Sequence, residues 1–300
     1  MKDRPPFPRC LLLTLGVSAP AKSGLFSGKT DEQFSAWVRQ FPEFSLLAEV
    51  VPKVIAPQHQ TPGPDAWERV AQVVRLLRPS IDGVVILHDR DLIVPAAVEL
   101  DLLLHGFDLP VMITSAGDRR SSENWRTNIV IALQAIASAV AGVSVLDGNR
   151  IVRASDARTE RGVLIGPNTA KFDFGLRRVT GSTRPSWPRP QIVLERSMRI
   201  WRYVPGLALP ETLQSHAILL QAPAMNPRSW TELEHWSASL GSRTHIICQT
   251  PQTPPKKILS RWGWVSDPDD AVAINQALWA FGQGSRWREA ASFARQRRNV

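Results

Sequence analysis

A run of four charged or titratable residues follows an apolar segment in the first half of the chain. Residues 83–87 are Gly-Val-Val-Ile-Leu, and His88, Asp89, Arg90 and Asp91 come directly after them. An arginine fork binds planar oxyanions in a bidentate way. An aspartate can hold an ammonium group, and histidine beside carboxylates can act as an acid or a base. These residue types favour recognition of a small charged molecule or proton transfer.

Each of these residues also has a structural interpretation. Arg90 and Asp91 could form an ion pair that fills the site, because breaking such a pair is costly once it is buried. His88, at the end of a buried strand, could be a hydrogen-bonded core histidine without a chemical role. An acid–base pair built from His88, Asp89 and Asp91 remains an alternative, but no pattern specifies a reaction for it.

The segments around this run alternate between strand and helix. The expected elements are a strand over 10–17, a helix over 65–78, a strand over 83–88, a helix near 93–105, a strand over 110–114, a helix near 127–140 and a strand over 142–146. This order predicts an α/β protein with a doubly wound, mostly parallel sheet. Open sheets of this kind bind ligands at the carboxyl ends of their strands, which is where residues 88–91 would lie.

A segment rich in proline divides the chain. Residues 180–190 contain three prolines among turn-forming residues, a composition that suits neither a helix nor a central strand. Beyond it, we expect strands over 191–195, 216–220 and 244–248, a helix near 229–239 and a helical region from 269 to 298. The pattern predicts an N-terminal domain over 1–182, a linker over 183–192 and a smaller C-terminal α/β domain over 193–300.

Composition limits the class of protein and its partners. The 300 residues are 43% hydrophobic, enough for a sizeable core, and no apolar run approaches the length of a bilayer span. We therefore expect a cytoplasmic protein without a membrane partner. Cys10 and Cys248 lack metal-ligand spacing, which predicts reduced thiols, no metal site and no cofactor. The net charge of +9 would suit nucleic acid, but the arginines are scattered along the chain, which argues against that partner.

Motifs spread over most of the chain resemble the bacterial L-asparaginase family, especially its cytoplasmic type. The matching segments are residues 11–16 of the first strand, the helix and strand at 96–104 and 109–114, Asn128, the turn at 203–206, the segment 249–252 and the run 267–283. The resemblance implies an asparaginase-like α/β fold with a large N-terminal and a smaller C-terminal domain. It also implies amidohydrolase chemistry and a homodimer with sites at the subunit contacts.

The same resemblance implies that the catalytic groups of the family are missing. Val17 stands at the position of the nucleophilic threonine, Arg90 at that of the second threonine and Thr159 at that of the lysine. The family's tyrosine is also lost, because the single tyrosine of this chain is Tyr203, in the second half. Only Asp91, at the position of the substrate-binding aspartate, is kept. A hydroxyl nucleophile and its proton acceptor act together, so these losses predict no asparaginase mechanism.

We therefore predict an asparaginase-like pseudoenzyme that acts as a binding or scaffolding partner. Its ligand would be a small carboxylate or amide, or a partner protein, bound near Asp91, Arg90, Asp89 and His88. The alternative is an amidohydrolase with an altered mechanism, which would use Asp91 and a hydroxyl outside the family set. The candidate hydroxyls are those of Thr14, Ser18, Thr114 and Ser115.

Overall fold

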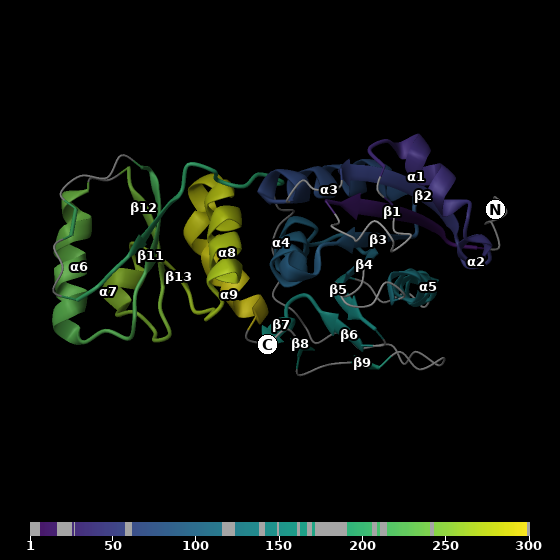
Figure 1. The fold of residues 1–300 in the computed structure, drawn as a ribbon. Coiled ribbons are helices and arrows are strands. Elements are labelled where there is room, and N and C mark those ends of the chain that lie inside the picture. The colour runs from purple at the N-terminus through teal and green to yellow at the C-terminus, as the bar shows by residue number, and fades with distance from the viewer. Residues whose placement is uncertain are drawn as a thin grey trace. The chain divides into compact units, whose positions relative to one another are not determined.

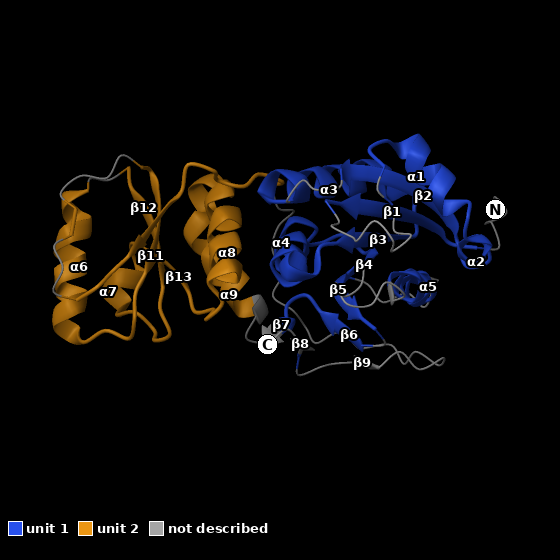
Figure 2. Cartoon of the chain, in the orientation of Figure 1, with its two compact units in different colours: residues 1–182 blue, residues 183–300 orange. Residues whose placement is uncertain are grey.

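The chain forms two compact units, residues 1–182 and residues 183–300 (Figure 2). The computed structural model describes residues 7–16, 26, 28–57, 62–115, 124–137, 142–148, 150–160, 163–166, 170–171, 191–205, 209–210, 215–240 and 243–298. Each unit contains a sheet of its own, with seven strands in the first and four in the second. In the part of the chain that the structure describes, no helix is long and apolar enough to cross a membrane.

The first unit is organised around a mostly parallel sheet (Figure 1). Its strand order is β2-β1-β3-β4-β5-β6-β9. The bounds are β1 Arg9–Leu15, β2 Glu49–Ala56, β3 Gly83–His88, β4 Pro110–Ser115, β5 Gly142–Asp147, β6 Arg150–Arg153 and β9 Ala170–Lys171. The first five of these strands in the sheet order run parallel, whereas β6 and β9 are antiparallel to their neighbours. A separate hairpin joins β7 Arg158–Glu160 to β8 Val163–Ile165.

Helices cover both faces of this sheet. One face packs against α1 Asp31–Val38, α2 Pro42–Ser45 and α5 Asn124–Ala137, and the other against α3 Pro64–Leu77 and α4 Ile93–Leu103. The first layer is aromatic: Trp37 of α1 and Trp125 of α5 lie with ring centroids 5.0 Å apart. Strand β3 is buried along its whole length, which explains its continuous apolar sequence. The central strands are thus fixed from both sides, and their carboxyl ends are held in place.

The second unit is a smaller parallel sheet with the order β10-β11-β12-β13. The strands are β10 Arg199–Arg202, β11 Ala217–Gln221, β12 His245–Gln249 and β13 Gly263–Val265. Helices α6 Pro227–Ser239 and α7 Lys256–Leu259 pack on one face through a core that includes Trp230, Trp236 and Trp262. Helices α8 Asp270–Gly282 and α9 Trp287–Arg298 pack against the sheet through β13 and β11 (Figure 1). Asn226 and Asp269 cap α6 and α8, so the helix starts are defined locally.

The predicted α/β class, with one large mostly parallel sheet and a second smaller one, is confirmed. The strand predicted over 83–88 has the bounds of β3, and the helix predicted over 65–78 is α3. The sequence patterns missed β2, the antiparallel strands of the first unit and the short helices α1, α2 and α7. The predicted linker 183–192 lies outside the described residues up to position 190.

The strand predicted over 191–195 is wrong. This segment lies along α8: the Glu195 amide donates to the Leu278 carbonyl at 3.0 Å, and the Gln283 side chain bonds both main-chain groups of Gln191. Gly282 permits this contact, because a Cβ there would lie 1.8 Å from the Val193 carbonyl oxygen. The alternation of apolar residues reflects packing against a helix, and the edge strand of the sheet is β10.

Candidate functional site

The strand register places the predicted residues of the first unit in two rows at the carboxyl edge of its sheet. Leu15, His88 and Ser115 are aligned across β1, β3 and β4, and Thr14, Leu87 and Thr114 form the row before them. Because successive side chains of a strand point to opposite faces, His88 and the two threonines face opposite sides of the sheet. The predicted hydroxyls Thr14 and Thr114 are therefore separated by the sheet from His88.

His88 is a fully buried core histidine with both ring nitrogens engaged. The indole Nε1 of Trp67 donates to its Nε2 at 3.2 Å, and its Nδ1 lies 3.0 Å from the carbonyl oxygen of Asp89. Because indole only donates, Nε2 must accept, and the proton therefore resides on Nδ1 and is donated to the carbonyl. Burial lowers the pKa of His88 to about 4. The neutral imidazole fastens the end of β3 to α3.

Asp89, Arg90 and Asp91 form a short turn of 3-10 helix after the strand. The Asp89 carboxylate caps this turn by accepting the Asp91 amide at 3.1 Å. The Arg90 guanidinium reaches Asp147, at the end of β5, with Nη2 3.4 Å from Oδ2. Asp91 is exposed. The edge thus presents a paired, partly exposed cation and one exposed carboxylate, and Asp89 has a structural task in the turn.

Three of the four hydroxyls predicted as substitute nucleophiles lie within the described residues, and these three are buried. Thr14 is 4% exposed, Thr114 is fully buried and Ser115 is 3% exposed. The Thr114 hydroxyl donates to the Leu146 carbonyl at 3.0 Å, and the Ser115 carbonyl accepts the Asn128 side-chain amide at 3.3 Å. A nucleophile must meet both its substrate and a proton acceptor. The Thr114 hydroxyl is engaged with the main chain, and the burial of Thr14 and Ser115 keeps these two side chains from an incoming substrate.

Three predicted positions cannot be placed. Val17 and Ser18 lie outside the described residues. Thr159 belongs to the backbone of β7, but its side chain is also outside what the structure describes. Within the described ranges, no group of three or more His, Cys, Asp or Glu side chains could hold a metal ion.

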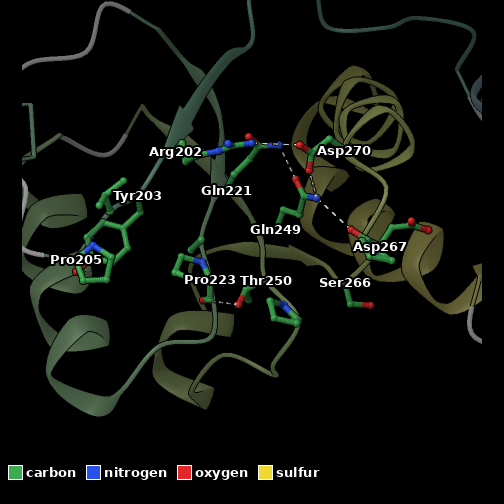
Figure 3. Close-up of a pocket in the computed structure, with 14 residues that line it drawn as sticks. Arg202, Tyr203, Pro205, Gln221, Pro223, Gln249, Thr250, Ser266, Asp267 and Asp270 are labelled. Carbon is green, nitrogen blue, oxygen red and sulfur yellow. Dashed lines mark hydrogen bonds and ion pairs between the residues drawn. The ribbon is translucent and has the colours of Figure 1, made fainter.

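The second unit has an open pocket that the sequence did not single out. A cavity of about 470 Å³ lies at the carboxyl ends of all four strands of its sheet (Figure 3). Residues from the ends of β10, β11, β12 and β13 and from the start of α8 line it. This is the location that parallel sheets use for ligands. In both units, polar residues lie at the carboxyl ends of the strands. In the second unit, these residues surround a cavity.

A hydrogen-bonded chain fixes the polar side of this pocket. Gln221 donates its amide to the Gln249 carbonyl oxygen at 2.9 Å. Gln249 in turn donates to the Asp267 carbonyl at 3.1 Å and to the Asp270 carboxylate at 3.0 Å. Arg202 lies 3.3 Å from the same carboxylate of Asp270 (Figure 3). The donors and acceptors are oriented before a ligand arrives, which lowers the cost of binding.

The rest of the pocket wall is mainly apolar. Pro205, Pro223, Pro251 and Pro268 line it, together with the ring of Tyr203. The Tyr203 hydroxyl donates to Glu232 at 3.1 Å, and burial raises the pKa of this phenol. A charged pair at the rim above an apolar wall suits a small molecule with separated positive and negative groups. The sequence signal that could have indicated this pocket is the set of turn residues that directly follow β11, β12 and β13.

Comparison with known proteins found a matching family model and solved structures of similar fold. The model of the asparaginase N-terminal domain matches residues 14–162. L-asparaginase I from Vibrio cholerae superposes with a TM-score of 0.69 at 16% identity, covering 96% of this chain and 97% of that one. The thermostable L-asparaginase from Thermococcus kodakarensis gives a TM-score of 0.60 at 14% identity, covering 95% and 96%. No curated protein matches the sequence.

The fold is therefore the asparaginase α/β fold. Residues 14–162 match the model of the asparaginase N-terminal domain, and the fold is that of the L-asparaginases, as the sequence resemblance predicted. At this low identity the solved structures establish the fold, and a shared fold does not determine the chemistry of the site.

Proposed function

We propose that this protein is a ligand-binding member of the asparaginase family that does not hydrolyse amides. The supporting observation is that the described candidate hydroxyls at the carboxyl edge of the first sheet are buried. Thr14, Thr114 and Ser115 are buried, and the Thr114 hydroxyl is engaged with a main-chain carbonyl. Arg90 offers a cation where the resemblance expects a second threonine, and it pairs with Asp147. A cation can bind a substrate but cannot attack a carbonyl carbon.

The pocket of the second unit is the proposed ligand site. Arg202 suits a carboxylate, and Asp270 suits an ammonium group. The amides of Gln221 and Gln249 suit a further polar group, such as a side-chain amide. This combination fits a zwitterionic amino acid or a related small carboxylate or amide. L-Asparagine is the first probe, because both structural neighbours are named as L-asparaginases.

A paired assay tests the proposal. Ammonia release from L-asparagine and L-glutamine is measured alongside calorimetric binding of the same compounds, for the intact protein and for Arg202→Gln. We expect binding without ammonia release, and weaker binding by the variant. Arg199→Gln is the matched control, because Arg199 is an exposed residue of the same strand that does not line the pocket. Binding unchanged in Arg202→Gln would place the ligand elsewhere.

The competing function is an amidohydrolase that uses Asp91 and a hydroxyl outside the family set. The exposure of Asp91 favours it, because a substrate could reach that carboxylate. Ammonia release at an ordinary enzymatic rate, abolished by Asp91→Ala, would establish this alternative and overturn a purely binding role.

We also propose a homodimer and a cytoplasmic location, which rest on the family resemblance. Light scattering at several protein concentrations tests the first, with a monomer at all concentrations as the contradicting result. Cell fractionation tests the second.

A further inference from the structure

A second cavity of the second unit lies at the opposite, amino-terminal edge of its sheet. It has a volume of about 330 Å³. His245, the first residue of β12, lines it together with Arg261, Trp262, Trp287 and Arg288. These residues come from separate elements, since Arg261 and Trp262 follow α7 while Trp287 and Arg288 begin α9. Nothing in the proposed function uses this cavity.

The wall of this cavity is positively charged. Two arginines and a histidine line it, and none of the eight residues that form the wall is acidic. Two carboxylates of the neighbouring helices are already paired: Glu234 of α6 binds Lys257 at 2.6 Å, and Glu289 of α9 binds Arg286 at 3.0 Å. In the described part of the chain, Arg261 forms no ion pair. The positive charge of the wall is therefore not compensated by its own residues.

Trp287 orders the charged groups around it. The His245 ring stacks on the indole with centroids 5.0 Å apart and an interplanar angle of 21°. The Arg288 guanidinium lies 5.8 Å from the centroid of the same indole and also donates to the Ser260 carbonyl. Cation–π contact and the hydrogen bond restrict the Arg288 side chain before any ligand is present. The cation cluster is thus partly preorganised.

The pKa of His245 is lowered mainly by burial and, to a smaller extent, by its charged neighbours. Burial lowers this pKa, and electrostatic repulsion from His216 and Arg288 lowers it further. Neighbouring cations disfavour a second positive charge, whereas an anion in the cavity would favour it. Burial accounts for most of the shift, and the smaller contribution of Arg288 has the sign expected for a cation close to the His245 ring.

We propose that this cavity binds the phosphate group of a small phosphorylated molecule. A phosphate monoester carries three terminal oxygens and close to two negative charges, which match two guanidinium forks and an imidazole. A single carboxylate would use only one fork. The phosphate fills part of the cavity, and the remaining volume accommodates a body of about the size of a sugar.

Calorimetry with inorganic phosphate, ribose 5-phosphate and ribose tests this proposal, with chloride at matched ionic strength as the blank. We expect both phosphate compounds to bind, the ester more tightly, and ribose to give no signal. Arg261→Gln and Arg288→Gln should each weaken ester binding at least tenfold. Arg228→Gln, an exposed arginine of α6 that does not line this cavity, should bind as the unmodified protein does.

Two results would overturn the proposal. One is equal heat from phosphate and chloride, and the other is unchanged ester binding in both arginine variants. Tighter binding of inorganic phosphate than of the ester would identify a site for the free ion, which also contradicts it. A nuclear magnetic resonance titration of His245 gives an independent check, because bound ester must raise its pKa relative to chloride. Because the carboxyl-edge pocket does not contribute, Arg202→Gln leaves this titration unchanged even if the proposed amino-acid binding fails.

Discussion

The carboxyl edges of the two sheets have the same place in the topology but different contents. In the first unit, the residues at the end of β3 and directly after it are engaged with the protein: His88 with Trp67, Asp89 with its own turn and Arg90 with Asp147. In the second unit, the end residues surround a cavity of about 470 Å³. Position in a parallel sheet therefore indicates where a site can form, and the side-chain partners decide whether it is open.

The comparison predicts that His88 matters for stability. In His88→Ala, the buried ring is removed and the Trp67 indole loses its acceptor. We expect a loss of about 4 kcal/mol in the free energy of unfolding, from the cavity and the unmade hydrogen bond. Urea unfolding measures it. Trp67→Phe, which keeps a ring but removes the donor, should cost roughly 1–3 kcal/mol. A stable His88→Ala protein with altered ligand binding would reverse this assignment.

Acid provides a second test at the same histidine. The pKa of His88 is about 4 in the folded protein, below the ordinary value of 6.5 that applies to the unfolded chain. The unfolded chain therefore binds the proton more readily. The neutral form stabilises the fold above pH 6.5, and this contribution is lost as the pH falls toward 4. The loss is on the order of 3 kcal/mol. Unfolding at a series of pH values should show this decline, and His88→Asn should lack this component.

The second edge should show the opposite behaviour, with binding more sensitive than stability. Arg202 and Asp270 are exposed at the pocket rim, with 71% and 54% of their side-chain surface accessible. We expect Arg202→Gln to weaken binding of a small carboxylate roughly tenfold, a typical effect of losing a charged partner. Its melting temperature should stay close to that of the unmodified protein. If Arg202→Gln lowered the stability strongly without changing the affinity, Arg202 would have a structural role and not a binding role.

The smallest effect is expected when the family residue is restored at position 90. Arg90→Thr removes an ion pair whose side chains are 38% and 31% exposed. Such pairs contribute less than about 1 kcal/mol. We also expect no ammonia release from L-asparagine, because a single hydroxyl does not rebuild a set of groups that acts together. Measurable hydrolysis by this variant would show that the edge lacks only the second threonine.

The sequence predicted the first edge better than the second for a physical reason. A strand buried on both faces has a continuous apolar sequence, so β3 and the residues that follow it are recognisable along the chain. The pocket of the second unit combines turns from four strands, and no local pattern connects Arg202 with Asp270. Local alternation also misled at 191–195, where Ile192 and Leu194 are buried against a helix and not within a sheet.

The two cysteines give the molecule a built-in reporter for each unit. Cys10 lies in β1 and Cys248 in β12, both are fully buried and free, and burial raises the pKa of each thiol. A thiol reagent attacks the thiolate, so neither cysteine should react until its own sheet opens. Because each unit holds one of the chain's two cysteines, the labelling rates of Cys10 and Cys248 measure separately how often each half of the protein opens.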